Sequence, residues 1–120
     1  LEPGYFGAHG NLAMALLDAG RIPEAVAEHE QWLRLQPGYK GVNHEFAVGL
    51  LKLGRFAEAQ VELEAMLNRG ADDDAETHNY LGVALAGQSQ RERARAEFNR
   101  ALQLRPDLKS AQENLESMGP

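Results

Sequence analysis

The sequence predicts an all-α fold in which three helix-turn-helix units follow one another along the chain. An apolar pair recurs in each unit, at Leu12-Ala13, Phe46-Ala47 and Leu81-Gly82, and the intervals between these pairs are 34 and 35 residues. A residue suited to a tight turn and then a second apolar stripe with helical spacing follow each pair. Periods of this length are typical of solenoids, in which each repeat packs only on its neighbours.

The first helix of each unit is expected near residues 6–19, 40–53 and 75–87. Two apolar residues four positions apart anchor each of these helices, as Leu12 and Leu16 do in the first unit. This spacing places both side chains on one helix face. The second helices are expected near residues 23–35, 57–69 and 91–104, with stripes formed by Ala25, His29, Trp32 and Leu33, by Ala59, Leu63, Met66 and Leu67, and by Ala94, Phe98, Ala101 and Leu102.

Turn residues separate the two helices of each unit. Gly20 and Gly54 can take the left-handed backbone conformation that ends a helix without a steric penalty. Ser89 occupies the equivalent place in the third unit and is less suited to it. We therefore expect Gly87 or Gln88 to assist the third turn.

Prolines and carboxylates mark other helix ends. Pro23 fits the first turn of its helix, and Pro37 and Pro106 are placed to end the helices before them. The second unit lacks such a proline and has Asp72–Asp74 before the next helix, where carboxylates favour the helix N-terminus. The extra residue of the 35-residue interval is expected in this turn.

Composition excludes several classes of protein. The chain has 120 residues, 43% of them apolar, which suits one soluble domain with a modest core. No apolar run approaches the roughly 18 residues of a membrane helix, and no leader resembles a signal peptide. A net charge of −6 argues against nucleic acid binding. With no cysteine, disulfides and thiolate metal sites are excluded, and the redox compartment stays undetermined. A cytoplasmic location is favoured, with the periplasm as the alternative.

The third unit resembles a tetratricopeptide repeat (TPR). The family pattern is W-x2-L-G-x2-Y, then A-x3-F, then P. This unit has Leu81-Gly82, Ala94, Phe98, Ala101 and Pro106 in register, and only the Trp and Tyr positions are changed, to His78 and Leu85. The other two units follow the same register, so the chain is similar to TPR proteins over nearly its whole length. The resemblance implies a right-handed α-α superhelix, or solenoid, of three repeats at 6–39, 40–74 and 75–108.

Both ends of the chain continue this register. Leu1-Glu2-Pro3 repeats the form of Leu35-Gln36-Pro37, so residues 1–5 are expected to be the tail of a preceding repeat and the chain a fragment of a longer protein. Residues 109–120 are polar and predict a C-terminal capping helix, which a terminal repeat needs for solubility. The alternative is that they begin a fourth repeat.

In this family the first helices line a concave groove that binds a peptide or a partner's helix. The register predicts apolar groove residues flanked by polar ones, and Asn11, His44 and Asn79 are expected to hydrogen-bond the backbone of the ligand. Coverage of this stripe by a missing segment and self-association are the alternatives. The predicted groove residues are Asn11, Met14, Leu17, His44, Val48, Leu51, Asn79, Tyr80, Val83 and Ala86.

One ligand class of the family is not expected here. Chaperone-binding members grip a C-terminal carboxylate with a clamp of Lys, Arg and Asn side chains on the first helices. The clamp positions in this chain are Gly10, Met14, Glu45, Glu76 and Tyr80. None of these residues is basic and two are acidic, so a terminal carboxylate would be repelled.

Catalytic and metal-binding patterns are not evident in the sequence. There is no H-E-x-x-H, no phosphate-binding glycine loop and no G-x-S-x-G. His9, His29 and His78 occupy positions that usually hold packed aromatic residues, so structural roles are expected. His44 is expected in the groove, but the adjacent Glu45 points about 100° away from it, which disfavours a shared metal.

The sequence therefore predicts no cofactor, no metal and no enzymatic activity of its own. Two functions are compatible with it. The first is a non-catalytic protein–protein interaction module that scaffolds an assembly. The second is a regulatory or substrate-presenting TPR segment of a larger enzyme, such as a glycosyltransferase.

Overall fold

The computed structural model describes residues 3–34, 44–71 and 74–119, with the side chains of residues 3–9 and 71 left out. Within these ranges the chain forms seven α-helices and one π-helical turn, and no strand. The described residues thus form the all-α helical-repeat solenoid that the sequence predicts. They fall into two compact units, Leu1–Tyr39 and Lys40–Pro120, and each is described by itself.

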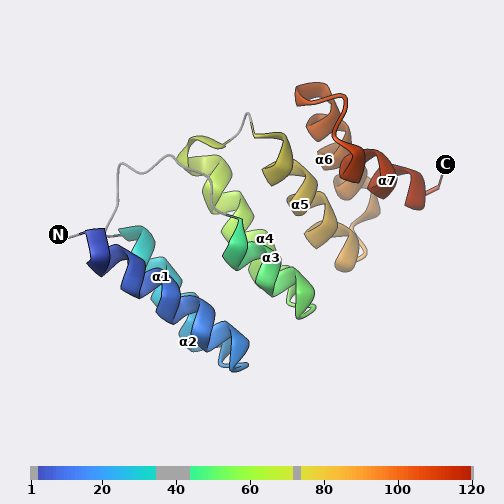
Figure 1. Ribbon diagram of the computed structural model, residues 1–120. Coiled ribbons are helices and arrows are strands. Elements are labelled where there is room, and N and C mark those ends of the chain that lie inside the picture. Colours follow the sequence, from blue (N-terminus) through green and yellow to red (C-terminus); the bar gives the residue numbers. More distant parts are fainter. Residues whose placement is uncertain (1–2, 35–43, 72–73, 120) are drawn as a thin grey trace. The chain divides into compact units, whose positions relative to one another are not determined.

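The first unit is a helical hairpin. Helix α1 (Pro3–Asp18) packs along helix α2 (Ile22–Arg34), as Figure 1 shows. Helix α1 begins earlier than predicted, at Pro3 rather than near residue 6. The core of the hairpin includes Ala13, Ala25 and His29, and the His29 and Trp32 rings lie 5.4 Å apart. His29 is 5% exposed, in keeping with its expected structural role.

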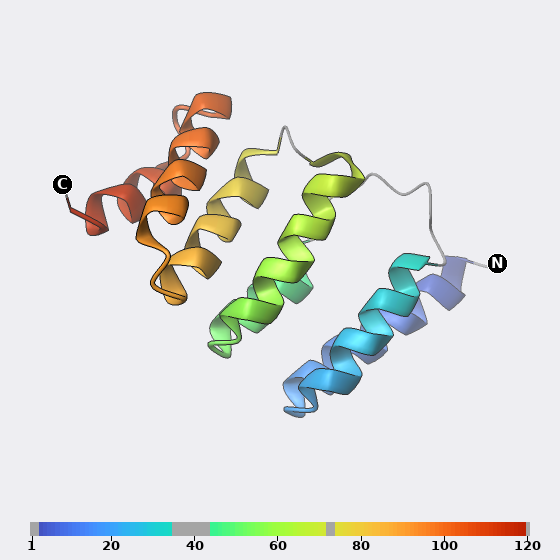
Figure 2. The same ribbon diagram turned by 180° about the vertical axis from the view of Figure 1, so that it is seen from behind.

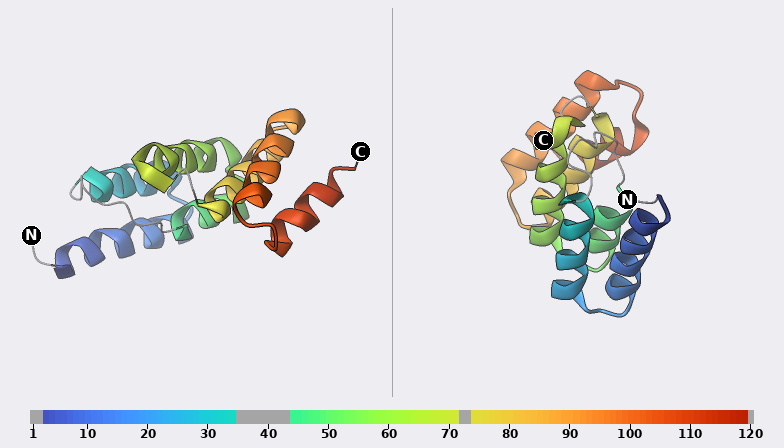
Figure 3. Two further views of the ribbon diagram at one scale, coloured as in Figure 1. Left: turned by 90° about the horizontal axis from the view of Figure 1, so that it is seen from above. Right: turned by 90° about the vertical axis from the view of Figure 1, so that its left-hand side faces the viewer.

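The second unit contains the remaining helices. Its first helices are α3 (Glu45–Lys52) and α5 (Ala75–Gly87), and its second helices are α4 (Phe56–Met66) and α6 (Arg91–Leu104). Opposite views show α3 and α5 in one layer and α4 and α6 in the other (Figures 1 and 2). Helix α7 (Lys109–Ser117) packs against α5 and α6 at the C-terminal side of this unit (Figure 3). The predicted bounds of α5 and α6 are confirmed, and residues 40–43 of the third predicted helix lie outside the described residues.

The turns within the hairpins share one backbone geometry. Gly20, Gly54 and Ser89 have φ angles of 80°, 73° and 63°. Ser89 itself therefore takes the left-handed conformation, although it is less suited to it than glycine. Gln88 assists this turn, as expected, because its side-chain amide donates to the carbonyl of Ala84 at 3.0 Å.

Two glycines of α5 allow aromatic rings to pack against its backbone. A Cβ atom on Gly82 would overlap the ring of Phe98 on α6, and one on Gly87 would overlap the ring of Phe56 on α4. Helix α5 is therefore held closely on both sides. This packing fixes the face that α5 presents in the first-helix layer.

The junction between α4 and α5 accommodates the longer interval. Helix α4 continues into a π-helical turn, η1 (Leu67–Ala71), in which Gly70 has a φ of 108°. The positive φ of Gly70 breaks the helix there, so the chain turns away from α4 before α5 begins. The carboxylate of Asp74 then caps α5, accepting from the Thr77 amide at 2.8 Å. The N-cap prediction is confirmed for Asp74, while Asp72 and Asp73 lie outside the described residues.

Candidate partner-binding surface

Helices α3 and α5 contact each other and carry a row of partly exposed apolar side chains. On each helix these residues are three positions apart, so they share one helix face. The opposite faces fill the core with fully buried residues such as Leu50 and Leu85. The name first-helix surface is used here for the partly exposed or exposed residues Val48, Leu51, Tyr80, Val83 and Ala86.

The predicted groove residues in the first unit have different environments. Asn11 is exposed and Met14 is partly buried. Leu17 is only 1% exposed, so its side chain belongs to the core rather than to an open surface. Its expected contact with a ligand is therefore wrong. Asn11 stays a predicted groove residue, whereas a helical register alone could not show how deeply Leu17 is covered.

Asn79 does not have the ligand-binding role expected for it. It is 4% exposed. Its side-chain amide donates to the Ser110 hydroxyl at 3.1 Å and its side-chain carbonyl accepts from the Asn114 amide at 3.0 Å. Both partners lie on α7, so Asn79 anchors that helix instead of hydrogen-bonding a ligand backbone.

His44 is likewise used within the second unit. Its side chain is 14% exposed, and Nε2 lies 2.8 Å from the Thr77 hydroxyl oxygen. That hydroxyl donates to Asp74 at 2.7 Å, so it must accept from the Nε2–H of His44. The expected hydrogen bond from His44 to a ligand backbone is therefore replaced by a contact with α5.

The surroundings of His44 are acidic and aromatic. Asp74 lies 3.2 Å from Nε2, Glu76 lies 3.7 Å from Nδ1, and the Tyr80 ring centroid lies 5.0 Å from that of the imidazole. No group of three or more potential metal ligands occurs within the described ranges. The cluster is thus a bridge between α3 and α5, with Tyr80 held beside it on the first-helix surface.

Charged residues lie at both ends of the first-helix surface. Glu45 is exposed in the first turn of α3, and Glu76 is 44% exposed in the first turn of α5. The guanidinium of Arg105 lies 3.2 Å from Glu76. Lys52 is exposed in the last turn of α3, at the other end.

Another histidine makes an interhelical contact that the sequence did not reveal. Nδ1 of the buried His78 lies 2.7 Å from a carboxylate oxygen of Glu97 on α6. The sequence offered one sign of this contact. His78 stands where the family pattern has tryptophan, and a buried imidazole ring needs a hydrogen-bond partner. The side chain of His9, at the equivalent position of the first unit, lies outside the described residues.

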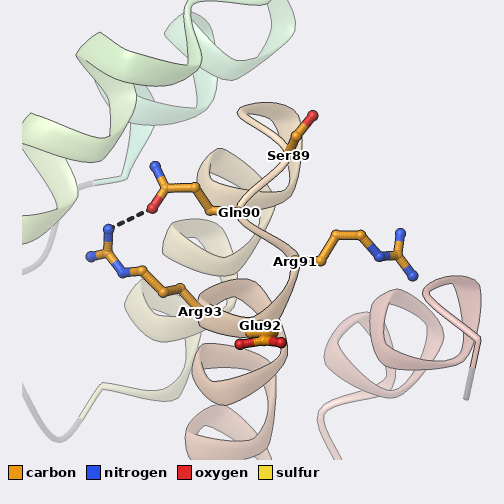
Figure 4. Close-up of a pocket in the computed structure, with 5 residues that line it drawn as sticks. All are labelled: Ser89, Gln90, Arg91, Glu92 and Arg93. Atoms are coloured by element: carbon orange, nitrogen blue, oxygen red, sulfur yellow. Dashed lines mark hydrogen bonds between the residues drawn. The ribbon is translucent and has the colours of Figure 1, made fainter.

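A separate shallow pocket lies at the turn between α5 and α6. Figure 4 shows its lining residues, with the Arg93 guanidinium donating to the Gln90 side chain at 2.7 Å. Arg91 donates to the backbone carbonyl of Met118. None of the lining residues belongs to the first-helix surface, so this pocket is no part of the candidate site. The lining residues are Ser89, Gln90, Arg91, Glu92 and Arg93.

The chain is built from repeating helical pairs, and aromatic rings pack closely against glycines of α5. With its partly exposed first-helix surface, it is a helical-repeat protein of the kind that presents a binding surface. Two family models described as tetratricopeptide repeat match the chain, over residues 16–84 and 75–108. The chain belongs to the tetratricopeptide repeat family. No curated protein sequence matches it significantly.

Solved structures with the same fold include two of the protein MamA. The chain is 26% identical to the MamA RS-1 ArsTM double mutant, with a TM-score of 0.74, covering 98% of this chain and 65% of that one. For MamA 41-end from Desulfovibrio magneticus RS-1 the identity is 26% and the TM-score 0.73, covering 94% and 63%. The chain therefore spans less than two thirds of either MamA chain.

A third similar structure matches over its whole length. It is the second TPR domain of human RPAP3 in complex with an HSP70 peptide, with 15% identity and a TM-score of 0.77, covering 99% of each chain. This likeness is one of fold. Separately, no helix within the described ranges is long and apolar enough to cross a membrane.

Proposed function

We propose that this chain is a non-catalytic protein–protein interaction module that binds a peptide or an amphipathic helix on its first-helix surface and so scaffolds a protein assembly. The observation that supports this most directly is the partly exposed apolar row on α3 and α5. The core of the second unit is filled by other residues, including Phe46, Leu50 and Leu85. The row keeps part of its apolar surface uncovered after this core is filled, and partly exposed apolar rows of this kind favour binding.

The chemistry of the row suits an apolar ligand. Burying the apolar area that these side chains still expose contributes about 25 cal/mol per Å², which the cost of association partly offsets. Tyr80 adds an aromatic ring that the neighbouring His44 holds in place. Rigid aromatic residues of this type are frequent among the side chains that dominate binding energy.

A C-terminal carboxylate is not the ligand we propose. The second TPR domain of RPAP3 is solved with an HSP70 peptide, and a related structure contains the HSP90 peptide SRMEEVD. In this chain the corresponding positions on α3 and α5 carry Glu45, Glu76 and Tyr80. The two glutamates would repel the acidic residues and the terminal carboxylate of such a peptide, and Tyr80 offers no positive charge to bind them.

The test compares two variants of the full chain that each introduce one glutamate, on different layers. Leu51→Glu places a charge on the first-helix surface, whereas Val61→Glu places one on α4, where the side chain is 59% exposed. Proteins captured from an extract by the wild-type chain should be lost with Leu51→Glu and kept with Val61→Glu. Sedimentation of each purified variant would identify self-association as the cause of any difference.

Two results would contradict the proposal. Equal capture by both variants would show that partners bind elsewhere. Saturable binding of a synthetic SRMEEVD peptide, lost with Leu51→Glu, would show that the surface accepts the terminal carboxylate that the acidic positions are expected to exclude.

A further inference from the structure

We infer that α7 is a detachable cap, and that the face of α5 and α6 beneath it binds the α7 helix of a second copy of this chain in exchange for its own. The residues concerned lie between 74 and 119, a range that the structure describes without a gap. None of them belongs to the first-helix surface, so the inference does not rest on the proposed function.

Helix α7 is attached by much less buried surface than α5. Of its nine residues only Ala111 is buried, and Leu108 and Met118 are covered at its two caps. Helix α5 buries eight of its thirteen residues and packs against a helix on each side, α4 and α6. A helix of nine residues is too short to be stable alone in water, so α7 stays helical because of this limited contact.

Polar side chains supply the remaining attachment of α7. Asn79 of α5 is hydrogen-bonded to Ser110 at 3.1 Å and to Asn114 at 3.0 Å, and Arg91 of α6 donates to the carbonyl of Met118. Water replaces such bonds when a helix leaves, so their net contribution is small. Segments with few buried apolar contacts open more readily than the whole molecule unfolds. Helix α7 therefore opens while α5 and α6 stay paired.

The face that α7 covers is apolar. The Phe98 ring packs on the backbone of Gly82 and holds α6 to α5 without any contribution from α7. This face joins Leu108 and Ala111 of the α7 side in one buried cluster. When α7 leaves, the face is exposed to water, which favours binding of another helix. The name cap face is used here for its residues Ala75, Ala101, Leu102 and Leu104.

The helix that fits the cap face in this structure is α7 itself, so a second copy of the chain carries the matching partner. Residues 105–108 join α6 to α7. Two hydrogen bonds close this linker, from the Leu108 amide to the Arg105 carbonyl at 3.1 Å and from the Gln112 side chain to the Pro106 carbonyl at 2.8 Å. Straightening the linker breaks them, and every contact of α7 then re-forms between the copies. Exchange of an identical element is a low-cost route to a dimer.

Hydrogen exchange and a fluorescent peptide of residues 107–119 test whether the cap face opens and binds a helix from another molecule. In the wild-type chain the amides of Lys109–Ser117 should exchange about tenfold faster, or more, than the amides inside α5. The peptide should bind the full wild-type chain saturably. The same peptide with Ala111→Glu should not bind, because the cluster would have to bury an unpaired charge.

A substitution in the chain separates opening of α7 from the quality of the cap face. Ala111→Gly removes a buried methyl group and lowers helix propensity in α7, but it leaves the cap face unchanged. The open form becomes more populated, so the wild-type peptide should bind this variant about tenfold more tightly. Ala96→Gly makes the same substitution at an exposed position of α6, and the affinity should stay within about twofold. Circular dichroism melting checks that both variants are folded.

Sedimentation of the wild-type chain at increasing concentration tests the second copy as the partner. We expect a dimer that excess peptide converts into peptide-bound monomers, since the peptide and the exchanged α7 compete for one face. The dimer should persist in Leu51→Glu, which distinguishes it from association through the first-helix surface.

Three results would overturn the inference. If the peptide bound neither the wild-type chain nor Ala111→Gly, α7 would not be detachable. If the peptide bound but the chain stayed monomeric at every concentration, a second copy would not be the partner. A dimer that excess peptide left intact would be held by a different contact.

Discussion

Replacing Gly82 with alanine tests how closely α5 and α6 pack, on which the position of the first-helix surface depends. A Cβ atom at this position would meet three ring atoms of Phe98, all nearer than 3.0 Å. Phe98 is 2% exposed and so has little room to move. Overpacking of this kind costs about 1–3 kcal/mol. Alanine is also the better helix former, by about 1 kcal/mol, so the net loss should be up to about 2 kcal/mol.

Gly10 provides a matched control in α1. It also lies inside a helix, but a Cβ there would meet the Trp32 ring at 3.8 Å, which is an ordinary contact distance. Gly10→Ala should therefore keep the propensity gain without the overlap and stabilise the protein by about 0.5–1 kcal/mol. Two substitutions with the same chemistry are thus expected to have opposite signs.

Urea denaturation, monitored by circular dichroism, measures both effects. If only stability has altered, the urea concentration at the midpoint shifts and the dependence of the unfolding free energy on urea stays the same. A loss of about 1 kcal/mol would lower the melting temperature by about 4 °C in a chain of this size. Combining Gly82→Ala with Phe98→Leu removes part of the ring and should recover stability relative to the sum of the single changes. If Gly82→Ala were as stabilising as Gly10→Ala, the close contact between α5 and Phe98 would be refuted.

Two further substitutions test contacts that position α5 and α7. Asp74→Ala removes the acceptor for the Thr77 amide and hydroxyl, and it should lower the free energy of unfolding, measured in urea, by about 1–2 kcal/mol. An unchanged free energy of unfolding would show that this cap is unimportant. Asn79→Ala leaves the α7 side chains Ser110 and Asn114 without this partner. It should speed hydrogen exchange of the backbone amides throughout Lys109–Ser117 and lower the free energy of unfolding by about 1–3 kcal/mol. Unchanged exchange in α7 would mean that apolar packing alone holds it.

The helices were predictable because their apolar residues repeat. Ala59, Leu63, Ala94 and Phe98 recur at equivalent positions of the second helices, and all four are buried. A stripe at helical spacing must be covered by another element, so the sequence determines both the helix and its buried face. The helix bounds followed from turn and capping residues, of which Asp74 is one, since these satisfy the free backbone groups at helix ends.

The polar part of the candidate site was not predictable in the same way. A helical register shows that His44 and Asn79 lie on the first-helix face but not which neighbouring side chain reaches them. The answer depends on Thr77 for His44 and on Ser110 and Asn114 for Asn79, and these belong to other helices. Buried polar groups require partners, and here the protein itself supplies them.

The contacts of His44 and Asn79 also explain why the apolar row remains partly exposed. The two residues are 35 positions apart, and each bonds a hydroxyl group near the start of a later helix, Thr77 of α5 for His44 and Ser110 of α7 for Asn79. Asn114 follows 35 positions later and completes the series on α7.

Hydrogen bonds of this kind hold α3 to α5 and α5 to α7 and fix their register. The contacts between these helices therefore do not have to bury Val48, Leu51, Tyr80 and Val83 completely, and their side chains stay partly exposed. On this argument the polar residues of the predicted groove build the surface, and the apolar residues between them are the ones available to a partner.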